Sequence, residues 1–163
     1  MTIFLVRHAH AGSRSRWVGD DALRPLSVRG HEQANGLVTV IGDAAIGHIL
    51  SSPYVRCMET VVPLAAARGL AIEPVPALAE GADIRDTLAL IAKHADAGAV
   101  LATHGDVIPG VLAALARQGV SIDPEARSPK GCTWVLRTDA TGEVTKVRYL
   151  PPPEAAGADD DDS

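Results

Sequence analysis

The stretch Ile3-Phe4-Leu5-Val6-Arg7-His8-Ala9-His10 decides the fold, because it joins a short apolar run to an arginine and a histidine. The apolar residues predict a buried strand, and the Arg7-His8 pair stands where that strand should end. Ligands of open α/β sheets bind at the carboxyl ends of the strands. A guanidinium grips anionic oxygens in a bidentate fork, and a neutral imidazole nitrogen is a nucleophile. The pair therefore suits an anion site, although taken alone it also suits a salt-bridged surface position.

Length and composition indicate one globular domain. With 163 residues, 47% of them hydrophobic, the chain can bury a normal core but has little room for two domains. No apolar run approaches the roughly 18 residues of a membrane span, so we expect no membrane association. The chain has only two cysteines, Cys57 and Cys132, and no charged and then apolar leader opens it, so we expect a reduced, cytoplasmic protein.

The net charge of −5 is unevenly distributed along the sequence. From Met1 to Arg56, six arginines outnumber four acidic residues and give this segment a charge of +2, so the remainder carries −7. A basic N-terminal third on an acidic protein allows a local anion site, and it argues against broad binding of nucleic acid.

Apolar stretches alternate with segments of helical periodicity. The expected strands cover residues 3–6, 46–51, 72–75 and 99–103, and the expected helices begin at Ser27, Ser52-Pro53, Asp83 and Asp106 and end near Gly42, Gly69, Gly98 and Gly119. Residues 132–137 and 143–150 predict a hairpin. The pattern predicts a single three-layer α/β domain over residues 1–150, with a mostly parallel central sheet, helices on both faces and a C-terminal hairpin. Residues 151–163 predict a disordered acidic tail.

Four side chains are expected to meet at the carboxyl edge of this sheet. Arg7 and His8 follow the first strand, Arg56 lies in the first turn of the helix after the second strand, and His104 follows the strand of residues 99–103. A helix N-terminus favours anions, and an arginine there adds to that preference. Two arginines and two histidines at one edge predict a phosphoryl-transfer pocket, in which cations hold the negative charge while one imidazole attacks.

The two residues after His104 have local explanations. Gly105 lets the backbone approach a ligand closely, because it has no side chain. Asp106 is interpreted as a helix cap rather than as an acid catalyst.

Four motifs in this order resemble the histidine phosphatase (phosphoglycerate-mutase-like) superfamily. They are Leu5-Val6-Arg7-His8-Ala9, Leu26-Ser27-Val28-Arg29-Gly30 with Gln33-Ala34, Ser51-Ser52-Pro53 with Arg56 and Glu59-Thr60, and Thr103-His104-Gly105. Together they span nearly the whole domain. The compact length and the Arg24-Pro25-Leu26 element make the chain most similar to SixA-type phosphohistidine phosphatases. It also resembles phosphatase domains joined to Nudix domains in nucleotide-cleaning proteins.

The resemblance implies roles for five residues. His8 would be the nucleophile, and Arg7, Arg56 and His104 would bind the phosphoryl group. Glu80 matches the position where many members carry the general acid, although SixA-type members need not keep that acid. His8, Glu80 and His104 are therefore the expected catalytic set, and the resemblance implies no metal and no cofactor.

The loop of residues 12–24 is expected to border the pocket, and we include its Ser13, Arg14 and Arg16 among the substrate-binding residues. One helix and one strand fill the interval from Glu80 to His104, which leaves no residues for a lid there. An open pocket would admit a phosphohistidine protein, a nucleotide or another phosphomonoester. The leaving group itself is not determined by the sequence.

Other residues near the motifs are given minor roles. Ala9 replaces the glycine of the family's common Arg-His-Gly, a change of little cost unless the backbone needs a positive φ. His10 is expected at the pocket rim at most. The remaining histidines, His31, His48 and His94, are expected to be structural or exposed.

Three competing interpretations can be checked against the residues. His8-Ala9-His10 resembles the paired ligands of metal-dependent amidohydrolases, which use a barrel of about 250 residues and further ligands that we do not find here. A cysteine phosphatase needs an arginine six positions after its cysteine, but Cys57 leads to Pro63 and Cys132 to Thr138. A phosphate-binding module with weak or no catalysis is the non-enzyme alternative. The presence of both histidines and both arginines argues against it, because holding a ligand would not need a nucleophilic imidazole.

Overall fold

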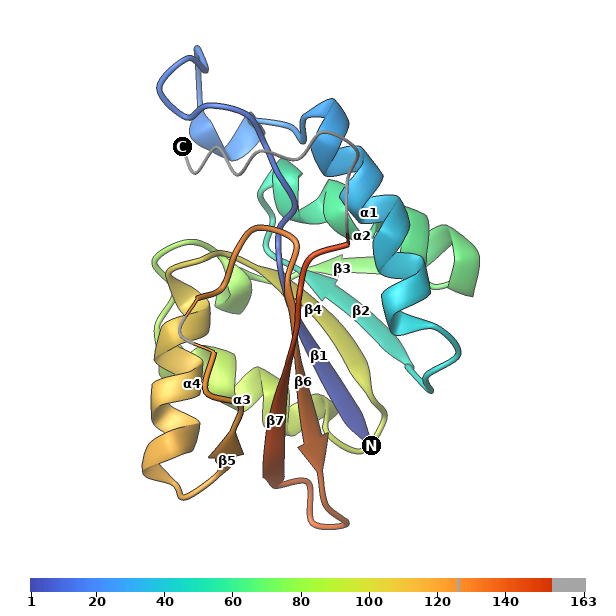
Figure 1. Cartoon of the computed structure of the whole chain (residues 1–163), viewed down its shortest axis with the longest axis vertical. Helices are drawn as coiled ribbons and strands as arrows, with labels where there is room; N and C mark the ends of the chain where they lie inside the picture. Colours follow the sequence, from blue (N-terminus) through green and yellow to red (C-terminus); the bar gives the residue numbers. More distant parts are fainter. Residues whose placement is uncertain (126, 154–163) are drawn as a thin grey trace.

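The computed structural model describes residues 1–125 and 127–153 of the chain. One sheet contains seven strands in the order β3-β2-β4-β1-β6-β7-β5 (Figure 1). The strands are β1 (Thr2–Arg7), β2 (His48–Ser51), β3 (Ile72–Pro74), β4 (Ala99–Thr103), β5 (Ser121–Ile122), β6 (Thr133–Thr138) and β7 (Val144–Leu150). The helices are α1 (Val28–Ile41), α2 (Val55–Arg68), α3 (Ile84–His94) and α4 (Val107–Arg117), with short 3-10 helices η1 (Asp21–Leu23) and η2 (Pro76–Leu78).

The sheet is mixed but mostly parallel. The pairs β1·β4, β4·β2, β2·β3 and β5·β7 are parallel, whereas β6 runs antiparallel to both β1 and β7. The expected α/β fold with its C-terminal hairpin is confirmed. The two-residue β5 was not predicted, since so short a strand has no periodicity to detect.

Alternation along β1 builds the two faces of the core. Ile3 and Leu5 pack in the cluster that includes residues of α3 and α4, whereas Phe4 and Val6 pack in the cluster that includes residues of α1 and α2. Figure 1 shows the two helix pairs on opposite sides of the sheet. Because β1 is buried on both faces, its residues read as one continuous apolar run.

The start of α2 differs from the prediction. The helix begins at Val55 after Tyr54, not at Ser52-Pro53, and Tyr54 makes no side-chain capping hydrogen bond. The Ser52 hydroxyl lies 2.8 Å from Nε2 of His104, and it also accepts a hydrogen bond from the Tyr54 amide. The side chain expected to cap the helix therefore belongs to the candidate site.

The chain beyond β7 is described through Pro153. A Cβ atom on Gly36 of α1 would lie 2.5 Å from Cβ of Pro153, so the proline lies close against this helix. The remaining residues of the expected acidic tail, 154–163, lie outside the described part. Among the described helices, none has both the length and the apolar character needed to cross a membrane.

Candidate active site

The parallel pairing of β1 with β4 brings two sequence motifs side by side. Arg7 is the register partner of Thr103, and the His8 amide donates a hydrogen bond to the Thr103 carbonyl at 2.9 Å. His104 directly follows β4, and its ring centroid lies 5.5 Å from that of His8. The adjacent strand β2 leads into α2, whose first turn carries Arg56. The predicted gathering at the carboxyl edge is therefore present.

The imidazole of His8 is oriented by the backbone that follows it. Its Nδ1 lies 2.8 Å from the Ala9 carbonyl oxygen, so Nδ1 is the protonated nitrogen and Nε2 carries the lone pair. The Ala9 amide donates to Oγ1 of Thr60, which fixes this turn to α2. Burial lowers the pKa of His8 well below its ordinary value, and the charges of Arg56 and Arg7 act in the same direction. His8 is therefore neutral at physiological pH.

His104 is neutral for the same reason. Burial lowers its pKa to about 4, and the charge of Arg56 adds to the effect. Because the Ser52 hydroxyl accepts from the Tyr54 amide, its own proton is available for Nε2 of His104. Nδ1 of His104 is then the donor nitrogen, and it has no hydrogen-bond partner among the described residues. A buried donor of this kind suits an anionic oxygen.

Arg7 is anchored at its guanidinium. Its Nη1 donates to the Ser128 carbonyl at 2.7 Å. A Cβ atom on Gly105 would come within 2.7 Å of this guanidinium. The glycine predicted to admit a ligand therefore makes room for the side chain of Arg7.

Arg56 is fully buried and bound by an acid that the sequence interpretation missed. Its Nη1 donates to the backbone carbonyl of Asp21 at 2.8 Å, and its Nη2 lies 3.1 Å from Oδ2 of the same residue. The guanidinium also lies 5.0 Å from the ring centroid of Tyr54, which in turn packs edge-on to His104. Its Nε has no hydrogen-bond partner within the described ranges.

The loop carrying Glu80 reaches the same guanidinium. Oε1 of Glu80 lies 3.8 Å from Nη2 of Arg56 and accepts a hydrogen bond from Nη2 of Arg14 at 2.8 Å. Asp106 stands at the N-cap position of α4 but makes no side-chain capping bond. Its Oδ2 instead accepts from the Gly81 amide at 2.8 Å, which corrects the predicted capping role. Asp106 thus positions the loop that holds Glu80.

The loop of residues 12–24 lies over the site rather than beside an open pocket. Arg24 is buried, and its Nη1 donates to the Ala11 carbonyl. Asp21 in η1 reaches Arg56, and Arg14 reaches Glu80. His8 is 5% exposed and His104 1%. The expected open pocket is therefore covered in this conformation.

Two other predicted substrate-binding residues lie on either side of Arg14 in this loop. Ser13 and Arg16 line a surface pocket of about 260 Å³, and the Ser13 hydroxyl lies 2.8 Å from that of Ser15. His10, expected at the rim, places Nδ1 2.7 Å from the Ser27 hydroxyl. Ala9 fits without strain, since every described residue with a positive φ is a glycine.

A cysteine thiol also lies beside His104 in the candidate site. Cys57 lies 3.5 Å from Nε2 of His104, but burial raises the pKa of its thiol to about 12, so it is a poor nucleophile. Within residues 1–125 and 127–153, one group of three donors could hold a metal ion. It lies outside the candidate site and consists of His48, Glu73 and His94.

Comparison with known proteins gives a sequence family and a fold. The family model of the histidine phosphatase superfamily (branch 1) matches residues 3–83. A curated relative, 8-oxo-(d)GTP phosphatase of Mycolicibacterium smegmatis, is 35% identical over 159 residues, which make up 94% of this chain and 49% of that protein. The chain therefore spans about half the length of this relative.

Solved structures share the fold at lower sequence identity. The protein histidine phosphatase SixA complexed with tungstate has a TM-score of 0.74 and 18% identity, covering 94% of this chain and 97% of that one. A mycobacterial glucosyl-3-phosphoglycerate phosphatase has a TM-score of 0.67 and 17% identity, covering 95% and 99%. These structures show the shared fold. The family model and the curated relative confirm the resemblance predicted from the motifs: the chain belongs to the histidine phosphatase superfamily.

Proposed function

We propose that this chain is a metal-independent phosphatase that acts through a covalent phosphohistidine on His8. The observation that carries the proposal is the hydrogen bond between Nδ1 of His8 and the Ala9 carbonyl, in a ring whose pKa is lowered by burial. This arrangement supplies a neutral imidazole with its lone pair on Nε2, which is the form a nucleophile needs.

The reaction divides into two transfers. Nε2 of His8 attacks phosphorus, and the bond to the leaving group breaks while Glu80, in its acid form, protonates the departing atom. Water then attacks the phosphohistidine, gives a proton to the Glu80 carboxylate, and releases phosphate and free His8. Arg7, Arg56 and Nδ1–H of His104 hold the phosphoryl oxygens in both steps, where the negative charge is spread over them. Arg56 and Arg7 supply the positive charge that a divalent cation supplies in other phosphatases.

A nucleotide is the substrate class with the most support. The relative at 35% identity is named an 8-oxo-(d)GTP phosphatase, and this chain matches about half of that protein. A phosphohistidine protein is the second candidate, favoured by the compact domain and the Arg24-Pro25-Leu26 element. A phosphate-binding module without turnover is the non-enzyme alternative. Such a module would not need a lone pair on Nε2 of His8.

The test is a substrate screen on wild type beside His8→Ala. The screen contains 8-oxo-dGTP, unmodified nucleotides, sugar phosphates, phosphoamino acids and a phosphohistidine protein, each assayed with and without a chelator. We expect turnover that needs His8, that is unchanged by the chelator and that is fastest on a nucleotide. Fastest turnover of the phosphohistidine protein would select the second candidate. Absence of turnover on every substrate, with phosphate still bound, would support the module instead.

A further inference from the structure

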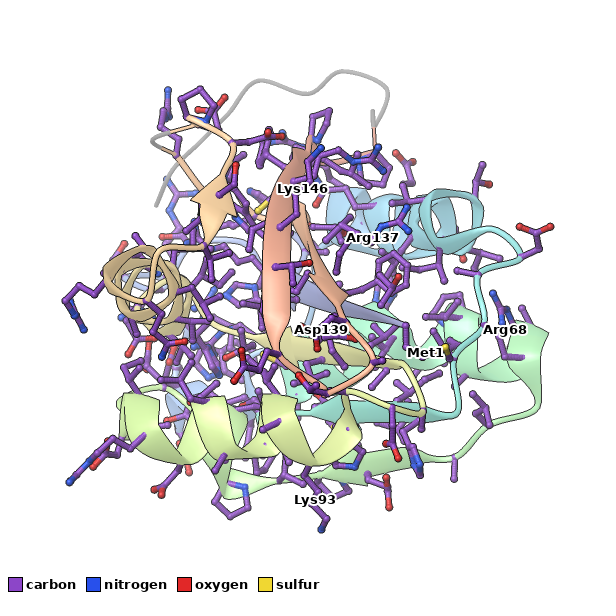
Figure 2. All side chains as sticks on the ribbon, turned by 90° about the horizontal axis from the view of Figure 1, so that it is seen from below. Met1, Arg68, Lys93, Arg137, Asp139 and Lys146 are labelled. Carbon is purple, nitrogen blue, oxygen red and sulfur yellow. The ribbon has the colours of Figure 1, made fainter. Side chains whose placement is uncertain are left out.

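His48, Glu73 and His94 form a compact group far from the candidate active site. His48 begins β2 and is the register partner of Ala99, the first residue of β4, whereas His104 follows the last residue of that strand. At about 3.3 Å per residue, the length of β4 separates the backbone positions of the two sites by roughly 13 Å. Figure 2 shows the end of the molecule that carries Met1 and the turn at Asp139. Lys93, the residue before His94, is labelled there as well.

Strand alternation and the position of α3 explain why the three side chains meet. Glu73 is the register partner of Leu50, so the two share a face of the sheet, and His48 lies two residues before Leu50 on that same face. Leu50 packs in the cluster that contains Ile91 of α3. His94 is the last residue of this helix, one turn beyond Ile91, and it therefore approaches the same edge.

The geometry of the group suits a shared cation. Nδ1 of His48 lies 3.6 Å from Oε2 of Glu73, and the rings of His48 and His94 pack edge-on with centroids 4.9 Å apart. One donor atom from each of the three residues lies within 4.8 Å of the others. Tetrahedral ligands about 2.0–2.1 Å from zinc are about 3.4 Å apart, so small side-chain rotations would complete the site.

The least exposed member is already oriented as a ligand. His94 is 8% exposed, and its Nδ1 lies 3.0 Å from the Leu90 carbonyl oxygen, which leaves Nε2 with the lone pair. Histidines that bind metals usually donate their other ring N–H in this way. The ion pair joins His48 to Glu73 and does not involve the second imidazole, that of His94.

We propose that His48, Glu73 and His94 bind one divalent transition-metal ion, with zinc as the best fit to two imidazoles and a carboxylate. The side chains of His48 and Glu73 are 44% and 56% exposed, so water can fill the fourth position. The ion would tie the end of α3 to the β2–β3 edge, away from the phosphoryl chemistry. Its role is therefore structural.

Zinc titration of the chelator-treated protein tests this site. We expect one equivalent of Zn²⁺ to shift the ring NMR signals of His48 and His94 and to raise the Tm. His48→Gln and Glu73→Gln change exposed side chains, and each should weaken zinc binding by at least ~10-fold, the smallest loss typical of changes around a metal site. His31→Gln is the matched control, because His31 also lies beside a glutamate, at 3.8 Å from Glu59, and is not part of the three-donor group.

The readout is binding, so it does not depend on phosphatase activity. Equal metal-free Tm values for wild type and both variants would show that a loss of binding is not a loss of folding. Unchanged zinc affinity in His48→Gln and Glu73→Gln would overturn the proposal. So would a response confined to the signals of His8 and His104, or an equal loss of affinity in His31→Gln.

Discussion

Oδ2 of Asp21 lies 3.1 Å from Nη2 of Arg56, while the backbone carbonyl of Asp21 accepts a hydrogen bond from Nη1 of the same guanidinium. These two oxygens occupy the Nη1 and Nη2 donors of Arg56, which would bind the oxygens of a phosphoryl group in the proposed mechanism. Burial alone would raise the pKa of Asp21, but the hydrogen bond from Arg24 and the charge of Arg56 hold it below the usual range. Asp21 is therefore ionised and competes with the substrate for Arg56.

Replacing Asp21 by asparagine should strengthen substrate binding. The amide keeps the volume of the side chain but loses the charge, so KM should fall by about tenfold, the lower end of the worth of a hydrogen bond to a charged group, while kcat changes little. Steady-state kinetics measure both. Asp20→Asn is the control, since it removes the same charge and its oxygen can still accept from the Ala22 amide. A KM unchanged in Asp21→Asn, or lowered equally in Asp20→Asn, would argue against competition.

Glu80→Gln separates an acid catalyst from a structural partner of Arg14. If Glu80 protonates the leaving oxygen, the substitution should slow alkyl phosphates by ~100-fold or more and p-nitrophenyl phosphate much less, because nitrophenolate leaves without a proton. The ratio of the two kcat values is the measurement. Arg14→Gln is the companion variant, because it breaks the 2.8 Å hydrogen bond to Glu80 and keeps the carboxylate. Equal slowing of both substrates in Glu80→Gln would assign it a structural role.

The two central histidines should make stability depend on pH. Burial lowers the pKa of His8 well below 6.5 and that of His104 to about 4. Between about pH 4 and pH 6.5, these histidines take up protons in the unfolded chain but not in the folded chain. Stability should therefore be fully present above about pH 6.5 and fall as the pH drops towards 4, by up to about 1.4 kcal/mol per pH unit for each histidine.

Urea denaturation between about pH 5 and pH 7 tests this dependence. Carboxylates with lowered pKa values change stability in the same direction, so the comparison is made against a variant. His104→Gln should have a shallower slope than wild type in this window. If stability depends on pH with the same slope in both proteins, His104 takes up its proton equally in the folded and the unfolded state, which would contradict its lowered pKa.

The fold was predictable wherever strands and helices carry strong local signals. The apolar run before Arg7 and the strand before His104 matched β1 and β4, and glycines ended α1 and α2 as expected. Pairing of parallel strands then determined that their carboxyl ends lie together. The position of the four cationic or imidazole side chains followed from topology and needed no knowledge of side-chain contacts.

The parts that were missed depend on contacts across the chain. Asp21 lies in an arginine-rich loop without periodicity. It is 35 residues from Arg56 in the sequence, and only the three-dimensional structure shows that the two side chains are in contact. Ser52 carries a helix-capping signal in sequence, but the hydrogen bond to His104 determines its position. The two adjacent acids Asp20-Asp21 among arginines were the one available sign that this loop folds back on a cation.

The most direct test of the proposed chemistry is to isolate the phosphorylated protein during turnover. Wild type and His8→Ala are mixed with a ³²P-labelled phosphomonoester, quenched in base, and the label is mapped by peptide sequencing. We expect label on His8 that survives alkali and is lost in acid, as a phosphoramidate is, and neither label nor turnover in His8→Ala. Acid-stable label on another residue, or turnover that persists in a correctly folded His8→Ala variant, would contradict the mechanism.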